Sequence, residues 1–161
     1  MDIEKEAIKM ASREYSNIIW CVADLAKLPF ESEKFDIITN IFSPSNYSQF
    51  NRILKKDGLL IKVIPGSDYL KELRTFFYKE TDKQSYSNEK VIKHFETNFN
   101  NIYQDNITYN INLNKDELRE LIQMTPLSWG ADDKKIQDIL DNEINNFTID
   151  LCIIIGKQIA G

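Results

Sequence analysis

The chain has 161 residues and a mass of 18.8 kDa, with 42% hydrophobic residues, 28% charged residues and a formal net charge of −5. This size and composition are typical of one globular domain, so we expect a single domain over residues 1–161. No run approaches the roughly 18 apolar residues of a membrane span, and the N-terminus lacks a basic-then-apolar signal pattern. We therefore expect a soluble, cytoplasmic protein without a membrane partner.

The two cysteines, Cys21 and Cys152, lie far apart in apolar runs. This placement favours small core residues over a disulfide framework or a four-ligand metal site. No bound metal is expected.

The acidic balance, 25 Asp and Glu against 20 Lys and Arg, excludes a surface built throughout to hold nucleic acid, because phosphate binding needs clustered cations. The net charge does not exclude a local strip of basic residues on the surface. We interpret its candidate lysines as solvated surface residues. They are Lys27, Lys34, Lys55, Lys56 and Lys62.

The first part of the chain predicts helices alternating with short apolar strands. Apolar residues at helical spacing predict a helix over 3–15, with the Asp2 carboxylate as its N-cap. Continuous runs rich in β-branched and aromatic residues predict buried strands. The elements that follow are a strand over 17–22, a loop over 23–34, a strand over 35–42, a helix over 47–54, a turn over 55–58 and a strand over 59–64.

The second part continues the alternation. Ser67 and Asp68 can cap a helix that reaches about Lys79, and Asn114 with Glu117 resembles a capping box. The other elements expected are a polar stretch over 81–87, a helix around 91–95, a strand over 106–113, a helix over 118–122, a loop over 123–130, a helix over 132–142, a strand over 147–155 and a tail from 156. Strands alternating with helices predict an α/β sheet with parallel strands.

Four strings stand in a defined order along the chain. They are Asp2-Ile3-x-Lys5-x-Ala7-Ile8, Ala23-Asp24-x-x-x-Leu28-Pro29-Phe30, Phe35-Asp36-Ile37-Ile38 and Leu54-Lys55-x-x-Gly58. Together they resemble the successive motifs of class I S-adenosylmethionine-dependent methyltransferases.

Two further strings narrow the resemblance. They are Pro65-Gly66-x-x-x-Leu70-x-Glu72-Leu73 and Leu121-Ile122-Gln123-Met124-Thr125-Pro126-x-x-Trp129. Both are similar to bacterial 23S rRNA guanine-N1 methyltransferases, and the resemblance covers essentially the whole chain.

The resemblance implies a Rossmann-like sheet with flanking helices, S-adenosylmethionine as cofactor and 23S rRNA as partner. Members of the family carry a zinc-binding domain, a first strand and a glycine-rich cofactor loop before the position of Asp2, and the 161 residues contain none of these. We therefore expect a partial methyltransferase domain whose sheet is N-terminally incomplete. Its exposed edges could be covered by rearrangement or by a homodimer.

The resemblance also implies which residues hold the cofactor. Asp2 would accept hydrogen bonds from the ribose hydroxyls, Asp24 would accept the adenine amino group, and the Leu25 amide would meet a ring nitrogen. The alternatives from the residues alone are a helix cap for Asp2 and an Asx turn for Asp24. Asp36 begins its strand, at the opposite edge, and is interpreted as structural.

The acceptor side is expected around the carboxyl ends of the strands, where ligands gather in open α/β sheets. Aromatic and proline side chains could stack on an extruded guanine, and amide or hydroxyl groups could bind its edge. For Trp129 the alternative is packing in the core. The predicted substrate-binding residues are Asn40, Phe42, Ser43, Pro44, Pro65, Gly66, Pro126 and Trp129.

No catalytic residue is assigned. No carboxylate or histidine is placed as a general base; the lone His94 is not expected to be a ligand, and Tyr69 and Tyr78 are expected in the core or at its rim. Two other functions stay open. One is methylation of a small molecule, and the other is a non-catalytic remnant or interaction module.

Overall fold

The computed structural model describes residues 1–79, 81, 84–142 and 144–159. Part of the predicted polar stretch and the end of the predicted tail lie outside these residues. The elements are, in chain order, α1 (Lys5–Glu14), β1 (Phe35–Ile41), α2 (Tyr47–Ile53), β2 (Leu54–Pro65), α3 (Lys71–Phe77), α4 (Glu89–Glu96), β3 (Phe99–Asn112), α5 (Lys115–Met124), the short 3-10 helix η2 (Pro126–Ser128), α6 (Asp133–Asp141) and β4 (Asn146–Gln158).

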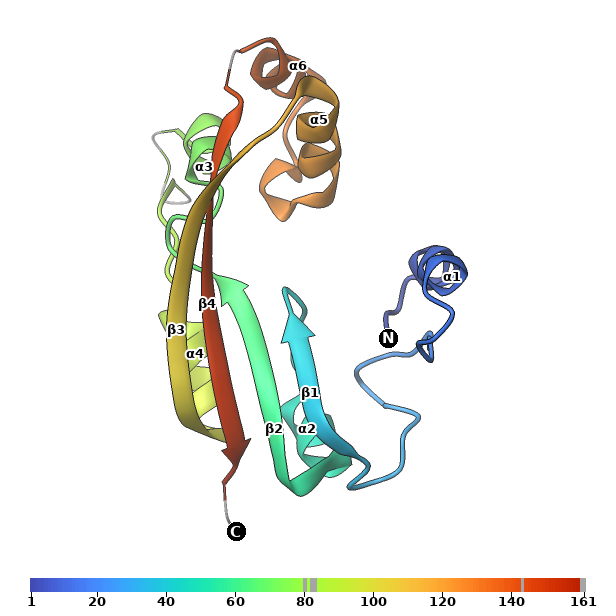
Figure 1. Ribbon diagram of the computed structural model, residues 1–161. Coiled ribbons are helices and arrows are strands. Elements are labelled where there is room, and N and C mark those ends of the chain that lie inside the picture. The colour runs from blue at the N-terminus through green and yellow to red at the C-terminus, as the bar shows by residue number, and fades with distance from the viewer. Residues whose placement is uncertain (80, 82–83, 143, 160–161) are drawn as a thin grey trace.

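The strands form one sheet in the order β1-β2-β4-β3 (Figure 1). The predicted α/β sheet with flanking helices is confirmed, but the expectation that all its strands are parallel is wrong. Only β1 and β2 are parallel, whereas β4 runs antiparallel to both of its neighbours. Because α5 and α6 connect β3 to β4 at one end of the sheet, the chain returns beside β3 without crossing the sheet, which gives an antiparallel pair.

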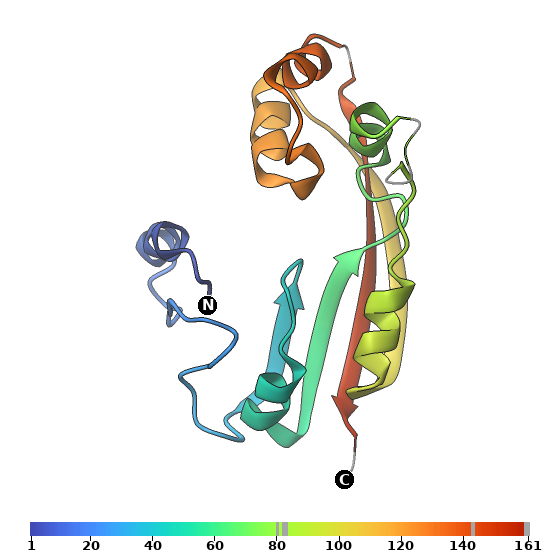
Figure 2. The ribbon, with the colours of Figure 1, turned by 180° about the vertical axis from the view of Figure 1, so that it is seen from behind.

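Two hydrophobic clusters share the sheet. The first lies under α2 and α4, which cover one face together (Figure 2), and contains Phe50, Leu60, Phe95 and Ile154. The second cluster lies between β4 and the helices α3, α5 and α6, which pack around Phe147. The expectation that Cys152 is a small core residue is confirmed, since it is buried as a free thiol, while Cys21 is half-buried and also free.

Helix caps predicted from local sequence are confirmed where no distant residue binds the capping group. Asn114 and Glu117 form the predicted capping box: the Asn114 side chain accepts from the Glu117 amide at 3.0 Å, and the Glu117 carboxylate accepts from the Asn114 amide at 2.8 Å. Asp132 caps α6 by accepting from the Lys135 amide, a cap that was not predicted from the sequence. These caps satisfy amides that the helix itself leaves free.

Two predicted caps are wrong. The N-cap of α1 is Glu4, while Asp2 accepts a hydrogen bond from the Glu4 amide at 2.9 Å. The N-cap of α3 is Leu70, in a left-handed conformation with φ of 50°, and not Ser67 or Asp68. The Asp68 amide is already bound to the Asp150 carboxylate of β4 at 2.9 Å, so a tertiary contact holds this segment and the helix starts later.

The predicted strand over 17–22 is also wrong. Only Val22 pairs, in an isolated parallel bridge with Asp2, and Ile19 is 96% exposed. An apolar run becomes a strand only when a neighbour satisfies its backbone groups, and in the described structure no strand of the sheet lies next to this run. The run is therefore irregular, with a turn and a bend at its start.

The ends of the other strands differ from the sequence-based boundaries. The predicted turn over 55–58 belongs to β2, because the register moves from Leu54 to Leu59 while β1 advances from Phe35 to Ile37. The four intervening residues form an irregularity in the ladder. Strand β3 begins seven residues before its predicted start, at Phe99, and β4 continues through the predicted tail to Gln158.

Strand β1 forms an edge of the sheet. Ile37 and Ile41 lie on its uncovered face and are 53% and 56% exposed. The N-terminal segment with α1 stands beside this edge in both views (Figures 1 and 2) without pairing with β1 in the described structure. In the described structure β1 therefore has no strand partner on its outer side, and the N-terminally incomplete sheet stays a prediction.

Gly156 gives a test of the first cluster. A Cβ atom at this position of β4 would lie 2.6 Å from the Phe95 ring and 2.9 Å from Phe99 Cβ. We expect Gly156→Ala to lower the free energy of unfolding by about 1–3 kcal/mol, as overpacking of a filled core does. Urea denaturation followed by circular dichroism measures it. The double variant Gly156→Ala/Phe95→Leu should recover part of the loss, and an unchanged midpoint in the single variant would contradict this packing.

Candidate active site

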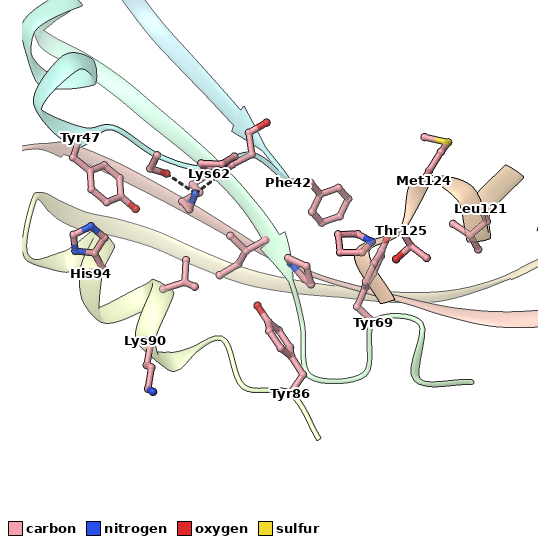
Figure 3. Close-up of a pocket in the computed structure, with 17 residues that line it drawn as sticks. Phe42, Tyr47, Lys62, Tyr69, Tyr86, Lys90, His94, Leu121, Met124 and Thr125 are labelled. Atoms are coloured by element: carbon pink, nitrogen blue, oxygen red, sulfur yellow. Dashed lines mark hydrogen bonds between the residues drawn. The ribbon is translucent and has the colours of Figure 1, made fainter. Parts of the chain in front are cut away.

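A pocket of about 740 Å³ lies at the carboxyl ends of β1 and β2 (Figure 3). Its walls come from the loop after β1, from β2, from α4 and from the end of α5 with η2. Most of the lining is aromatic or apolar. The lining residues are Phe42, Ser43, Pro44, Ser45, Tyr47, Lys62, Ile64, Pro65, Tyr69, Tyr86, Lys90, Val91, His94, Leu121, Met124, Thr125 and Pro126.

The loop between β1 and α2 forms the mouth of the pocket. Phe42 has a left-handed backbone with φ of 49°, its amide donates to the Val63 carbonyl at 3.1 Å, and its side chain is half-exposed. The rings of Phe42 and Tyr69 lie side by side, with centroids 5.3 Å apart. A bulky residue rarely adopts this backbone conformation, so the surrounding contacts hold the Phe42 ring at the mouth.

Lys62 lies at the floor of the pocket, and the expectation that it is a solvated surface residue is wrong. It is only 3% exposed. Its Nζ donates to Asn40 Oδ1 at 2.6 Å and to Ser45 Oγ at 2.7 Å. Burial lowers the pKa of the Lys62 ammonium, because removing water penalises the charged form. The position is visible in the sequence as the only polar residue on the inward face of β2 between Leu60 and Ile64.

Asn40 supports this loop from below. Its Nδ2 donates to the Pro44 carbonyl at 3.0 Å, and its Oδ1 also accepts from Ser45 Oγ at 3.1 Å. Both ends of the amide are therefore occupied, and Asn40 does not line the pocket. Its contacts are those of a residue that positions Lys62 and the loop.

The other predicted substrate residues divide into two groups. Pro65 and Pro126 line the pocket. Gly66 does not, because its amide donates to the Asp150 carbonyl at 2.7 Å and a Cβ atom there would overlap the Asp150 carboxylate. Trp129 also lies outside the pocket and is 72% exposed, so its alternative role as a core residue is wrong.

Several aromatic lining residues carried no sequence signal of a site. Tyr47 is 4% exposed, its ring lies 5.0 Å from that of His94, and burial raises its pKa. Burial also raises the pKa of Tyr69, which lies at the rim as expected. His94 contacts the Tyr47 ring. Within the described residues no group of three His, Cys, Asp or Glu side chains could hold a metal ion.

The predicted cofactor residues lie on the N-terminal segment. The bridge to Val22 brings Asp2 beside the start of the loop that holds Asp24. Asp24 Oδ1 accepts from the Ala26 amide at 2.8 Å, which confirms the Asx turn. In the carboxylates of Asp2 and Asp24 alike, the hydrogen bonds seen in the described structure involve only Oδ1. The remaining carboxylate oxygens are of the type that accepts ribose hydroxyls and an adenine amino group, so they fit the adenosine half of the cofactor.

One hydrogen bond connects this segment to the pocket. Asn46 Nδ2 donates to the Leu25 carbonyl at 3.0 Å, while Asn46 Oδ1 caps α2 by accepting from the Gln49 amide at 3.2 Å. Arg52 adds bonds to the carbonyls of Leu28 and Phe30, at 2.9 and 2.6 Å. The segment over 25–30 is thus held against α2, the helix that follows the pocket loop.

Asp36 lies far from these groups, as expected. It forms an exposed ion pair with Lys55 at 2.8 Å, so the structural interpretation of Asp36 and the surface interpretation of Lys55 are both confirmed. Among the described helices none has the length and apolar character needed to cross a membrane.

Comparisons with known proteins relate the chain to methyltransferases. A family model described as a methyltransferase domain matches residues 1–62. The chain is 38% identical over 158 residues to a Bacillus subtilis (strain 168) protein provisionally named 23S rRNA guanine-N1 methyltransferase YxjB, covering 98% of this chain and 56% of that protein. It is 29% identical over 136 residues to the 23S rRNA (guanine(748)-N1)-methyltransferase of Streptomyces fradiae, covering 82% of this chain and 47% of that protein.

The chain therefore spans about half the length of the curated relatives it matches. A solved structure from Bacillus halodurans, provisionally named a methyltransferase, superposes with a TM-score of 0.60 at 16% identity, over 99% of this chain and 81% of that one. At that identity the likeness shows the fold alone. The relatives carry the likeness further: residues 1–62 match a methyltransferase domain, and nearly the whole chain aligns with part of a protein provisionally named as a 23S rRNA guanine-N1 methyltransferase.

Proposed function

We propose that this chain supplies the acceptor pocket and the adenosine-binding residues of an S-adenosylmethionine-dependent methyltransferase that modifies guanine N1 in cytoplasmic 23S rRNA. The observation that carries the proposal is the pocket at the carboxyl ends of β1 and β2, with aromatic walls and a buried ammonium. Enzymes that modify a base take it out of the stack and hold it between aromatic side chains. The names of the curated relatives support rRNA as the substrate class.

The residues of the pocket have separate tasks in this proposal. Phe42 and Tyr69 offer ring faces on which a base can stack, and their neighbouring rings form one aromatic wall. Ser43 can bind the base edge, while Pro44, Pro65 and Pro126 exclude water. S-adenosylmethionine supplies the methyl group when it is bound. Because methyl transfer is an in-line displacement, the chain contributes mainly alignment of the acceptor.

Asp2, Asp24 and Leu25 are proposed to hold the adenosine half of the cofactor. The two carboxylates accept hydrogen bonds, and the Leu25 amide can donate one. A glycine-rich loop for the methionine half is not among the 161 residues. The chain by itself is then a weak cofactor binder.

Two other functions make different demands on the same pocket. A small-molecule methyltransferase would methylate a metabolite and ignore ribosomal RNA. A non-catalytic module would bind neither cofactor nor base. The pocket volume of about 740 Å³ can admit a metabolite as well as a base, so the acceptor has to be identified by experiment.

We also propose that two copies associate through the open β1 edge. An unpaired edge with exposed Ile37 and Ile41 is a template for pairing with another chain. Pairing would satisfy the free backbone groups of β1 and cover these side chains.

The first experiment measures the transfer of labelled methyl groups to 23S rRNA, by the chain alone and by the chain mixed with the part of YxjB that it does not match. For the mixture we expect 1-methylguanosine in nuclease digests of the rRNA analysed by mass spectrometry. Phe42→Ala should slow the transfer roughly 10- to 100-fold, in the range of the stacking energy lost per base. Tyr103→Ala, a half-exposed aromatic on β3, is the matched control. Methylation of metabolites without methylation of rRNA would refute the proposal.

The second experiment is calorimetric titration of the chain with S-adenosylmethionine. We expect a dissociation constant weaker than 1 mM, less than about 4 kcal/mol of binding free energy, because the methionine half lacks its loop. Asp24→Asn should weaken residual binding further, and Asp36→Asn should not. A micromolar constant would show that the loop is unnecessary.

The third experiment is light scattering over a range of concentrations. We expect the average mass to rise with concentration, and Ile41→Lys to shift the protein toward the monomer because a charge would be buried at the paired edge. Ile102→Lys, at the opposite edge on β3, is the control. A monodisperse monomer at all concentrations would contradict association through β1.

A further inference from the structure

The pocket contains a buried cation without a buried anion. Lys62 is 3% exposed, and within the described part of the chain none of the ion pairs involves it. Burying an unpaired ammonium is costly, and an apolar residue would fit the inward row of Leu60 and Ile64. A position that opposes stability in this way points to a task in the pocket.

The hydrogen bonds of Lys62 leave part of its capacity unused. Its Nζ has three protons to donate. Two go to Asn40 Oδ1 at 2.6 Å and Ser45 Oγ at 2.7 Å, both uncharged acceptors. Among the described residues the third proton has only the Ser43 carbonyl, at 3.5 Å, which is long for a hydrogen bond. A molecule in the pocket with an acceptor atom near the floor would bind this proton better.

The partners of Lys62 also fix its direction. Asn40 is tied to the Pro44 carbonyl, and Ser45 Oγ donates back to Asn40 Oδ1. The ammonium is therefore held in one place, in the same pocket as the aromatic pair of Phe42 and Tyr69 that forms its mouth (Figure 3). A base stacked on that pair would present its edge to the floor.

The edge that suits an ammonium is that of guanine. Guanine presents O6 and N7 as adjacent acceptors, and lysine and arginine read this pair in protein–nucleic acid complexes. Adenine has an amino donor in place of O6, and a donor facing an ammonium is repelled. The chemistry on the floor of the pocket thus discriminates between the two purines.

We propose that Lys62 donates a hydrogen bond to O6 of the acceptor guanine and is the residue that selects guanine over adenine. Asn40 and Ser45 are positioning residues that hold the ammonium at the floor. This inference rests on the proposed function, because it places a base in the pocket. The inference adds to the proposed function the residue that distinguishes guanine from adenine.

The test is NMR titration of the ¹⁵N-labelled chain with GMP and with AMP, the free nucleotides serving as probes. We expect wild-type protein to bind GMP about ten-fold or more tightly than AMP, within the discrimination of one such contact. Lys62→Met should abolish the preference. Lys62→Gln should shift it toward AMP, because an amide can both donate to and accept from adenine. Lys56→Met, at an exposed lysine of the same strand β2 outside the pocket lining, is the matched control and should keep the preference.

The outcomes separate this inference from the proposed function. If Lys62→Met binds GMP with the wild-type preference, the inference is overturned and the base pocket stands. If wild-type protein binds neither nucleotide, the base pocket fails, and the inference fails with it. Urea denaturation checks the fold of both variants. Removing the buried charge should leave the Lys62→Met midpoint at or above that of the wild type, and Lys62→Gln gives a second reading if Lys62→Met does not fold.

Discussion

The central place of β4 is the constraint on which the rest of the structure depends. This last strand lies between β2 and β3 and contributes to both hydrophobic clusters, with Ile154 in one and Phe147 in the other. Its Asp150 carboxylate binds the Asp68 amide at 2.9 Å and Thr108 Oγ1 at 3.0 Å. Asp150, near the C-terminus, thus fixes both the segment that follows β2 and the neighbouring strand β3.

The pocket follows from this arrangement. Because β4 holds the segment after Pro65, Tyr69 is placed against Phe42 from the loop after β1. The helices α5 and α6, which precede β4, bring Pro126 and Thr125 to the same space. Glu72 adds a second attachment, since its carboxylate accepts from the Thr148 amide at 3.0 Å and hydroxyl at 2.7 Å. Although its partial burial acts in the opposite direction, these hydrogen bonds lower the pKa of Glu72.

The strings that carry the family resemblance have different physical roles. Glu72 attaches α3 to β4, and Gly66 allows the Asp150 carboxylate to approach the backbone. Pro126 reaches the pocket, whereas Trp129 of the same string is exposed to solvent. A motif shared by a family is therefore a mixture of residues that hold the fold and residues that face the site. Only the structure separates them.

The sequence alone determined features that depend on neighbours in the chain. The capping box of Asn114 and Glu117, the buried free thiol of Cys152 and the apolar strands β1 and β4 follow from local spacing and composition. Tertiary structure decided the features that depend on distant partners. The 17–22 run did not become a strand because no strand of the described sheet adjoins it, and the antiparallel direction of β4 comes from its connection through α6. Alternation along β2 places Lys62 on the inward face, but only the folded loop, with Asn40 and Ser45, supplies the acceptors that hold it as a buried ammonium facing a pocket.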